Sequence, residues 1–303
     1  MTRALIITNP AAARTDRDAV RVVERILRRG GWRAEVLVTG GDGDARRYAE
    51  EGVRAGVDVV AVFGGDGTTM QAAAALVGTD IGLGVLPGGT GNLLAGNLRI
   101  PMHPQKSAEL LLASRPRKFD LGRMRRPDGV HYFAVACGAG FDARVMAETS
   151  SAAKRRWGMG AYVATTLRIL PDVRSTETWI TIDGVEHRLR TSMVLVANCG
   201  EVIPPFVKLR SGIAPDDGLL DVLAVRADSI RESIRAFWDV LREAPPSGLE
   251  PYVTHLRGQE VAVQTTEVRP VQLDGETGGM TPFTVSIVPG AIRVMVPPGP
   301  GET

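Results

Sequence analysis

The chain has 303 residues, of which 44% are apolar, and its 36 basic and 34 acidic residues leave a formal net charge of +2. This length predicts about two domains with sizeable hydrophobic cores, and the small net charge argues against a general nucleic-acid or polyanion-binding role. The first apolar run is shorter than the ~7–15 residues of a signal peptide, and no run approaches the roughly 18 that span a bilayer, so we expect a cytoplasmic protein.

Short apolar runs alternate with helical patterns over the first third of the chain. A helix with apolar spacing near 3.6 residues follows the first run, with Asp16 or Asp18 as its cap and Gly30 at its end. The next helices are expected to begin near Asp44 and Thr68, each directly after a glycine-rich loop. Such loops lie at the carboxyl ends of strands, where open α/β sheets bind ligands. We expect parallel strands of one α/β sheet at residues 4–8, 34–39, 57–63 and 81–87.

From about residue 117 the pattern changes to short strands joined by tight turns. Two antiparallel hairpins are expected, one with strands 118–124 and 131–137, the other around the turn Asp183-Gly184. Later strands are interrupted by one clear helix, which begins with a capping box formed by Ser229 and Glu232. A mostly β second domain is therefore expected to follow the α/β domain.

Two stretches have the same sequence, Gly-Gly-Asp-Gly, at residues 40–43 and 64–67. A phosphate loop needs glycines, so that backbone N–H groups converge on the anion, and a helix start. For the first stretch we favour a plain turn, because Asp44 looks like an ordinary helix cap. The second is favoured as the phosphate loop, because another glycine-rich turn follows the next strand at 86–98. The carboxylate of Asp66 would repel a phosphate bound there, unless a cation such as Mg²⁺ lies between them or the carboxylate accepts a proton from the substrate.

Six short motifs follow one another along the chain: NPAAA at 9–13, GGDGT at 64–68, LPGGTGN at 86–92, DLG at 120–122, APDDGLLDV at 214–222 and LDGE at 273–276. Together they resemble the bacterial lipid kinases of the diacylglycerol kinase and sphingosine kinase superfamily. The resemblance implies an ATP-dependent kinase with a Rossmann-like doubly wound nucleotide-binding domain, a C-terminal β-sandwich domain and an active site in the cleft between them. The domains are expected at 1–123 and 124–292, with a tail at 293–303 packing back on the first.

The resemblance also implies roles for individual residues. Asp66 and Asp120 would belong to the network around a catalytic Mg²⁺. Glu276 would be the general base that accepts the proton of the lipid hydroxyl, with Asp66 as the competing candidate. ATP would be contacted by Asn9, Pro10, Thr39, Gly64, Gly65, Asp66, Gly67, Thr68, Gly89, Thr90 and Asn92.

A second, structural Mg²⁺ is implied at Asp217, completed by carbonyls near Ala214 and Leu219. Each of these motifs also has a simpler interpretation. The stretch around Asp217 could be a surface turn, residues 273–276 could be a tight Asp-Gly turn, and Asp120 could be a solvated residue at a strand end.

Two departures from the family pattern leave the acceptor lipid open. Asn92 is followed by Leu93, where family members acting on diacylglycerol often have an acidic residue, and Met70 and Gln71 stand where Asn and Glu are common. The acceptor could be diacylglycerol-like, sphingoid or a related lipid. The alternatives are an NAD kinase-like phosphotransferase, or a non-catalytic lipid or nucleotide sensor on the same fold.

A lipid kinase would meet its substrate at the membrane surface. Residues 152–163 combine Lys154, Arg155 and Arg156 with Trp157, a composition that could bind anionic headgroups or form a solvated basic helix end. We expect transient membrane association and no nucleic-acid partner, and leave a homodimer open.

Overall fold

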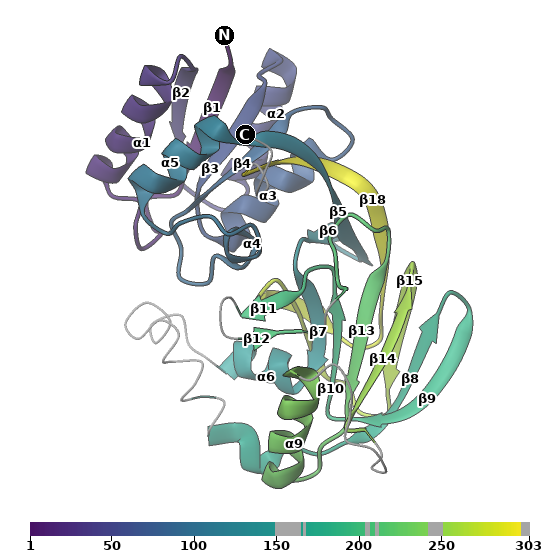
Figure 1. Ribbon diagram of the computed structural model, residues 1–303. Helices are drawn as coiled ribbons and strands as arrows, with labels where there is room; N and C mark the ends of the chain where they lie inside the picture. The colour runs from purple at the N-terminus through teal and green to yellow at the C-terminus, as the bar shows by residue number, and fades with distance from the viewer. Residues whose placement is uncertain (149–164, 166–167, 204–206, 210–211, 242–250, 298–303) are drawn as a thin grey trace. The chain divides into compact units, whose positions relative to one another are not determined.

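The computed structural model describes residues 1–148, 165, 168–203, 207–209, 212–241 and 251–297 (Figure 1). The chain forms two compact units. The first unit comprises Met1–Phe119 and Gly290–Thr303, and the second comprises Asp120–Pro289. The strands β5 (Arg115–Arg126) and β18 (Phe283–Val296) contain the two points at which the chain passes from one unit to the other.

The first unit is built on a parallel sheet. Its strands follow the order β2-β1-β3-β4, with bounds Arg3–Thr8 for β1, Arg33–Val38 for β2, Val59–Gly64 for β3 and Gly82–Pro87 for β4. The end of β18 extends this sheet, because Arg293 and Val294 pair in parallel with Gly82 and Leu83 of β4. The apolar runs identified in the sequence correspond to these strands.

Helices cover both faces of this sheet. Helix α1 packs against α5, and α2 packs against α3 (Figure 1). Ile6 of β1 belongs to the core that includes Val23 of α1 and Leu111 of α5, and the adjacent Ile7 is also fully buried. Burial of successive residues explains the continuous apolar runs, and the predicted doubly wound domain is confirmed. The helices are α1 (Arg17–Arg29), α2 (Asp44–Ala55), α3 (Asp66–Leu76), α4 (Leu93–Asn97) and α5 (Pro104–Ala113).

The starts of three helices refine the sequence-based expectations. Asp16 caps α1, and its carboxylate accepts two backbone hydrogen bonds from the first turn. Gly43, with φ of 82°, precedes α2, so Asp44 is the first helical residue and not the cap. Helix α3 begins at Asp66, two residues before the expected Thr68. The carboxylate of Asp66 therefore belongs to the first turn of a helix, where the helix dipole favours negative charge.

The second unit is a sandwich of two sheets, as predicted. One has the order β6-β5-β18-β15-β8-β9, with β6 at Gly129–Phe133, β15 at Glu260–Thr265, β8 at Thr176–Ile182 and β9 at Val185–Thr191. The other has the order β14-β13-β10-β7-β16-β17, with bounds Val253–Gly258, Leu220–Val225, Met193–Ala197, Ala136–Gly140, Pro270–Leu273 and Glu276–Met280. A core that includes Phe133 and Ile180 of the first sheet and Val222 of the second lies between them.

The described part of the second unit also contains smaller elements. A two-stranded sheet pairs β11 (Glu201–Ile203) with β12 (Val207–Lys208). Two helices, α6 (Phe141–Glu148) and α9 (Ile230–Leu241), and a 3₁₀ turn at Leu170–Asp172 lie beside the sheets. Within the described ranges, no helix is long and apolar enough to cross a membrane.

The expectation of a single strand at 131–137 is wrong. Strand β6 ends at Phe133 in one sheet, and β7 begins at Ala136 in the other. Between them the chain crosses the sandwich, and the carboxylate of Asp274 accepts hydrogen bonds from the N–H groups of Ala134, Val135 and Ala136 at 2.7–2.9 Å. A side chain about 140 residues away thus supplies the partners that a continuous ladder would have supplied.

Candidate active site

The glycine loops that follow β3 and β4 lie in direct contact in the first unit. The N–H groups of Gly88 and Gly89 donate to the carbonyl of Gly64 at 2.7 and 3.2 Å. A Cβ atom on Gly89 would lie 2.6 Å from the Cα of Gly65, closer than unbonded carbon atoms can approach. Only glycine therefore allows the two turns to pack backbone against backbone.

Asp66 connects the two loops. Its Oδ1 accepts the N–H of Leu93, the first residue of α4, at 2.7 Å. A Cβ on Gly91 would lie 2.8 Å from Asp66 Oδ2, so the glycine also makes room for the carboxylate. Gly65, the residue before α3, provides no side-chain cap for the first amides of that helix. The result is a helix N-terminus with a glycine cradle beside it, an arrangement that binds phosphate in many proteins.

The remaining residues predicted to contact ATP lie at this same carboxyl edge of the sheet. Asn9 follows β1, and its Nδ2 donates to Thr68 Oγ1 at 3.1 Å. Asn92, with φ of 49°, accepts the N–H of Gly89 at 2.9 Å and donates to its carbonyl at 2.8 Å. Thr39 follows β2 and is buried, whereas Pro10 and Thr90 are exposed. The structure thus brings the residues predicted to contact ATP from four neighbouring strand ends to one edge.

The other Gly-Gly-Asp-Gly loop uses its own amides. The N–H groups of Gly40 and Gly41 both donate to Asp44 Oδ2, at 2.8 and 3.0 Å. A hydrogen bond from the Arg47 guanidinium lowers the pKa of the Asp44 carboxyl. Asp42 Oδ1 accepts a hydrogen bond from Gln71 at 2.6 Å, so a residue that departs from the family pattern links α3 to this loop. These contacts favour the plain-turn interpretation of residues 40–43.

In the second unit, Asp120 is a buried anchor. It is 3% exposed, which rules out the interpretation as a solvated strand end. Its Oδ2 accepts the N–H of Gly218 and its own N–H donates to the carbonyl of Pro215, each at 2.7 Å. Asn198 Nδ2 donates to its carbonyl at 2.9 Å. Asp120 therefore holds the loop that contains the predicted structural metal ligands.

Asp217, predicted to bind a structural Mg²⁺, faces a cation of the protein itself. Its Oδ1 accepts the N–H of Leu219 at 3.0 Å, and its Oδ2 forms an ion pair with Arg257. Arg257 Nε also lies 3.0 Å from Asp221 Oδ1, which is 2.6 Å from His255 Nε2. Burial raises the pKa of Asp221, and the hydrogen bond from His255 and the charge of Arg257 oppose this shift.

The predicted structural Mg²⁺ would have to compete with the guanidinium of Arg257, which forms an ion pair with the Asp217 carboxylate. Among the described residues, no group of three His, Cys, Asp or Glu side chains could hold a metal ion, so a metal at Asp217 would depend on the predicted carbonyls near Ala214 and Leu219. Asp217, Ala214 and Leu219 remain a predicted metal site.

The LDGE motif contains two carboxylates with different surroundings. Asp274 and Gly275 form the tight turn between β16 and β17, with φ of 46° and 84°. Glu276 begins β17 and is exposed, so its carboxylate is accessible. Burial raises the pKa of Asp274 to about 6, although its three backbone hydrogen bonds favour the anion. The tight turn is thus present, and Asp274 is the structural residue that the motif did not reveal.

Asp274→Asn should reduce the pH dependence of stability. The raised pKa means that the folded protein binds this proton more tightly than the unfolded chain. The resulting stabilisation is full below about pH 4 and is lost as pH rises through about 6, and a shift of roughly two units corresponds to roughly 3 kcal/mol. Asn does not titrate, so the variant does not lose stability in this way as the pH rises. Its amide group faces backbone N–H donors, which lowers the free energy of unfolding by about 1–3 kcal/mol at every pH.

Urea unfolding of both proteins between pH 4 and 7 measures this difference. The free energy of unfolding of wild type minus that of Asp274→Asn should fall as the pH rises. Other carboxyl groups titrate alike in both proteins, so the difference reports on Asp274 alone. A difference that stays constant over this range would show that Asp274 titrates alike in the folded and unfolded chains.

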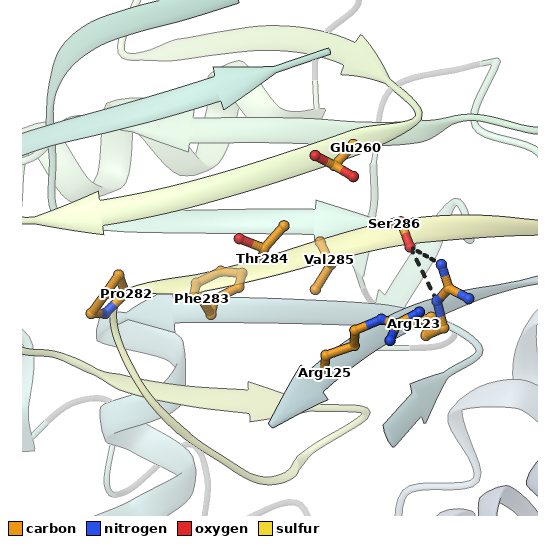
Figure 2. Close-up of a pocket in the computed structure, with 8 residues that line it drawn as sticks. All are labelled: Arg123, Arg125, Glu260, Pro282, Phe283, Thr284, Val285 and Ser286. Carbon is orange, nitrogen blue, oxygen red and sulfur yellow. Dashed lines mark hydrogen bonds between the residues drawn. The ribbon is translucent and has the colours of Figure 1, made fainter. Parts of the chain in front are cut away.

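One surface pocket of about 350 Å³ lies in the second unit (Figure 2). It is lined by Pro282 and by residues of β5, β15 and β18. The guanidinium of Arg123 donates to Ser286 Oγ from Nη2 at 3.1 Å and from Nε at 3.3 Å. None of the residues predicted from the motifs lines this pocket.

Comparison with known proteins agrees with this geometry. Residues 3–124 match the model of the diacylglycerol kinase catalytic domain, and residues 135–296 match the YegS C-terminal NAD kinase beta sandwich-like domain. A diacylglycerol kinase of Mycobacterium tuberculosis is 30% identical, over 96% of this chain and 94% of the relative. The chain belongs to the diacylglycerol kinase family. A diacylglycerol kinase of Bacillus subtilis is 28% identical, over 98% of this chain and 97% of the relative.

A solved structure shares the fold of this diacylglycerol kinase family member. The crystal structure of a diacylglycerol kinase from Bacillus anthracis has a TM-score of 0.75 at 21% identity, and the match covers 99% of this chain and 98% of that one. The resemblance noted in the sequence is therefore confirmed. Membership supports kinase activity, and the family implies that ATP is used.

Gly89→Ala should weaken ATP binding in this family member. The added methyl group would meet the backbone of Gly65, which cannot swing aside as a side chain can. We expect a loss of about 1–3 kcal/mol in stability and at least a tenfold rise in the Kd for ATP. Gly41→Ala is the matched control, because nothing lies within 4 Å of its Cβ position. Calorimetric titration with ATP would contradict the assignment if both variants bound like wild type.

Proposed function

We propose that the protein is an ATP-dependent lipid kinase, which transfers the γ-phosphate of ATP to a hydroxyl group of a lipid. The observation that carries this proposal is the pair of glycine turns joined by Asp66 at the N-terminus of α3. The names of the relatives favour a lipid acceptor. Leu93 occupies the position where an acidic residue is common in enzymes acting on diacylglycerol, so a diacylglycerol-like, a sphingoid or a related lipid fits the proposal.

Phosphoryl transfer mainly requires that two reactants are positioned and that charge on the γ-phosphate is neutralised. In this proposal the backbone amides of the loop at 64–68 and those around Gly89 hold the phosphates of ATP. Carboxylate oxygens are ligands that Mg²⁺ prefers, and we assign Asp66 and Asp120 to its network. Mg²⁺ bound with ATP would neutralise the charge that develops on the phosphates.

The acceptor hydroxyl must lose its proton as the new bond forms. We assign this role to Glu276, because it is the exposed carboxylate of the LDGE motif. The neighbouring Asp274 is buried and accepts three backbone hydrogen bonds, which leaves it a structural role. A carboxylate base typically contributes ~10²–10⁴ in rate.

The decisive experiment offers several acceptors at once. Purified protein is incubated with labelled ATP, Mg²⁺ and a total lipid extract, and the labelled product is identified by mass. A phosphorylated lipid is expected. The assay includes NAD, since the second matched domain is described as like the β-sandwich of NAD kinase. Labelled NADP would favour that alternative, and nucleotide binding without any transfer would favour a sensor.

The predicted structural Mg²⁺ at Asp217 has a thermal test. Metal that binds only the folded protein stabilises it by mass action. Chelation should therefore lower the melting temperature of wild type by several degrees, and that of Asp217→Ala by much less. Arg257→Gln is the companion variant, because it removes the competing cation and should increase the effect of chelation. Equal shifts in all three proteins would count against a metal at this position.

A further inference from the structure

Helix α9 turns an apolar face toward solvent. Ile230, Ile234, Phe237 and Trp238 follow one another at helical spacing and are each 44–52% exposed. Phe237 and Trp238 pack edge to face, with ring centroids 6.0 Å apart. A surface helix normally buries such a stripe against its own domain. In this helix the stripe, which we call the α9 stripe, forms one exposed patch, as is typical of an interaction site.

The opposite face of α9 attaches the helix to the second unit. Ala236 and Asp239 are buried there, and Asp239 Oδ2 accepts the N–H of Tyr252 at 3.1 Å. Ser229 Oγ accepts the N–H of Glu232 at 3.3 Å, which is one half of the predicted capping box, whereas Glu232 Oε2 accepts the N–H of Asp228 and not that of Ser229, at 2.7 Å. Both acidic side chains are thus turned to backbone amides, and the α9 stripe is not needed to anchor the helix.

Two exposed basic residues lie beside the α9 stripe. Arg231 and Arg235 are one turn apart on the same flank of the helix. Arg235 Nη1 reaches the Tyr252 hydroxyl at 3.5 Å, a contact that leaves its charge available. The outward surface of α9 therefore combines apolar and aromatic side chains with positive charge, and its acidic residues face inward.

We propose that α9 docks the protein on an anionic lipid bilayer. The α9 stripe would enter the boundary between headgroups and acyl chains, with Arg231 and Arg235 at the lipid phosphates. A helix lying in the interface plane needs this combination of apolar face and basic flank, and Trp favours that depth. We favour an anionic membrane over an apolar protein partner, because the positive charges of Arg231 and Arg235 complement the negative charges of the lipid phosphates. The choice of a membrane also rests on the proposed function, because a lipid kinase must reach its acceptor.

This surface differs from the one expected from the sequence. The basic and aromatic segment at 152–163 lies outside the described residues. Helix α9 is a separate element, for which the sequence analysis predicted only the cap at Ser229 and Glu232 and no membrane contact.

Vesicle co-sedimentation of the full chain tests the proposal. The vesicles contain equimolar phosphatidylglycerol and phosphatidylcholine, with pure phosphatidylcholine as the comparison. Ile234→Ser combined with Trp238→Ser should weaken binding at least about tenfold. Arg231→Gln combined with Arg235→Gln should weaken it by roughly fivefold per charge, and only on the anionic vesicles. All four side chains are exposed, so the urea midpoint should stay near that of wild type.

The matched control replaces two apolar residues elsewhere in the second unit. Val185 and Val268 are 60% and 67% exposed, and Val185→Ser with Val268→Ser should bind vesicles like wild type. If the control weakens binding as much as the α9 variant, or if the α9 variant binds like wild type, the proposal is wrong. A dimeric wild type that becomes monomeric in the α9 variant would also overturn it, since the stripe would then join two copies.

Kinase assays separate this proposal from the proposed function. With a short-chain acceptor dissolved in water, the α9 variant should transfer phosphate at the wild-type rate, whereas on vesicles it should be slower by the loss in binding. If vesicle binding depends on α9 but no lipid is phosphorylated, the kinase proposal is wrong and the docking surface is supported. If wild type and the α9 variant transfer phosphate equally fast on vesicles, the docking surface is wrong and the kinase proposal is supported.

Discussion

Asp66→Asn is expected to abolish phosphoryl transfer, whereas Asp42→Asn should leave it near the wild-type rate. The two residues occupy the same position in identical Gly-Gly-Asp-Gly stretches. Asp66 lies in the first turn of α3, beside the glycine turn after β4. Removing its charge should reduce kcat by about 10²–10³ or more, as for other groups that stabilise charge in a transition state. Transfer from labelled ATP measures the effect.

The fold should survive both substitutions. Asparagine keeps an oxygen that can accept the N–H of Leu93, so Asp66→Asn retains the link between the loops. Asp42 is exposed, and its asparagine can still accept from Gln71. Urea unfolding should place both variants within about 1 kcal/mol of wild type. Equal losses of activity in the two variants would refute the assignment of the phosphate loop.

Glu276→Gln should lower kcat by about 10² or more while ATP binds as in wild type. Glutamine keeps the size and hydrogen-bonding shape of the side chain and removes its basicity. Glu276 is exposed at the start of β17, so the exchange should not disturb the sandwich. Single-turnover kinetics with saturating ATP and lipid isolate the transfer step, and calorimetry gives the affinity for ATP.

Asp66 is the competing candidate for the general base, and the same assays can distinguish it from Glu276. If Glu276→Gln turns over at a near wild-type rate while Asp66→Asn is inactive, the proton acceptor is Asp66. Glu186→Gln is a control for the loss of one carboxylate, since Glu186 is also an exposed strand residue of the second unit. Its rate should equal that of wild type.

The sequence predicted the first unit well for a physical reason. Strands such as β3, at Val59–Gly64, are buried along their whole length and therefore appear as unbroken apolar runs. The glycine loops were located correctly because parallel strands end at one edge. The start of α3 was missed by two residues, because Asp66 and Gly67 are poor helix formers and tertiary contacts decide their conformation.

The second unit was harder to predict because its decisive contacts are remote in the chain. Residues 131–137 look like one strand, and only the carboxylate of Asp274 shows why they are divided between two sheets. The ion pair of Asp217 with Arg257 joins residues 40 positions apart, so no local pattern could indicate it. In the candidate site the motifs predicted Asn9, Asp66 and Asn92, which the structure places at one edge of the sheet. The contact of Gln71 with Asp42 could be found only in the folded chain.

The pairing of β18 with β4 limits how the protein can be divided. The first unit is not one continuous stretch of sequence, because Arg293 and Val294 cover the edge of β4. A fragment that ended at Phe119 would carry every predicted nucleotide contact, yet it would leave Gly82 and Leu83 at an open edge. Open strand edges recruit other strands, so such a fragment would tend to aggregate. Joining residues 290–297 to it through a short linker would restore the missing neighbour.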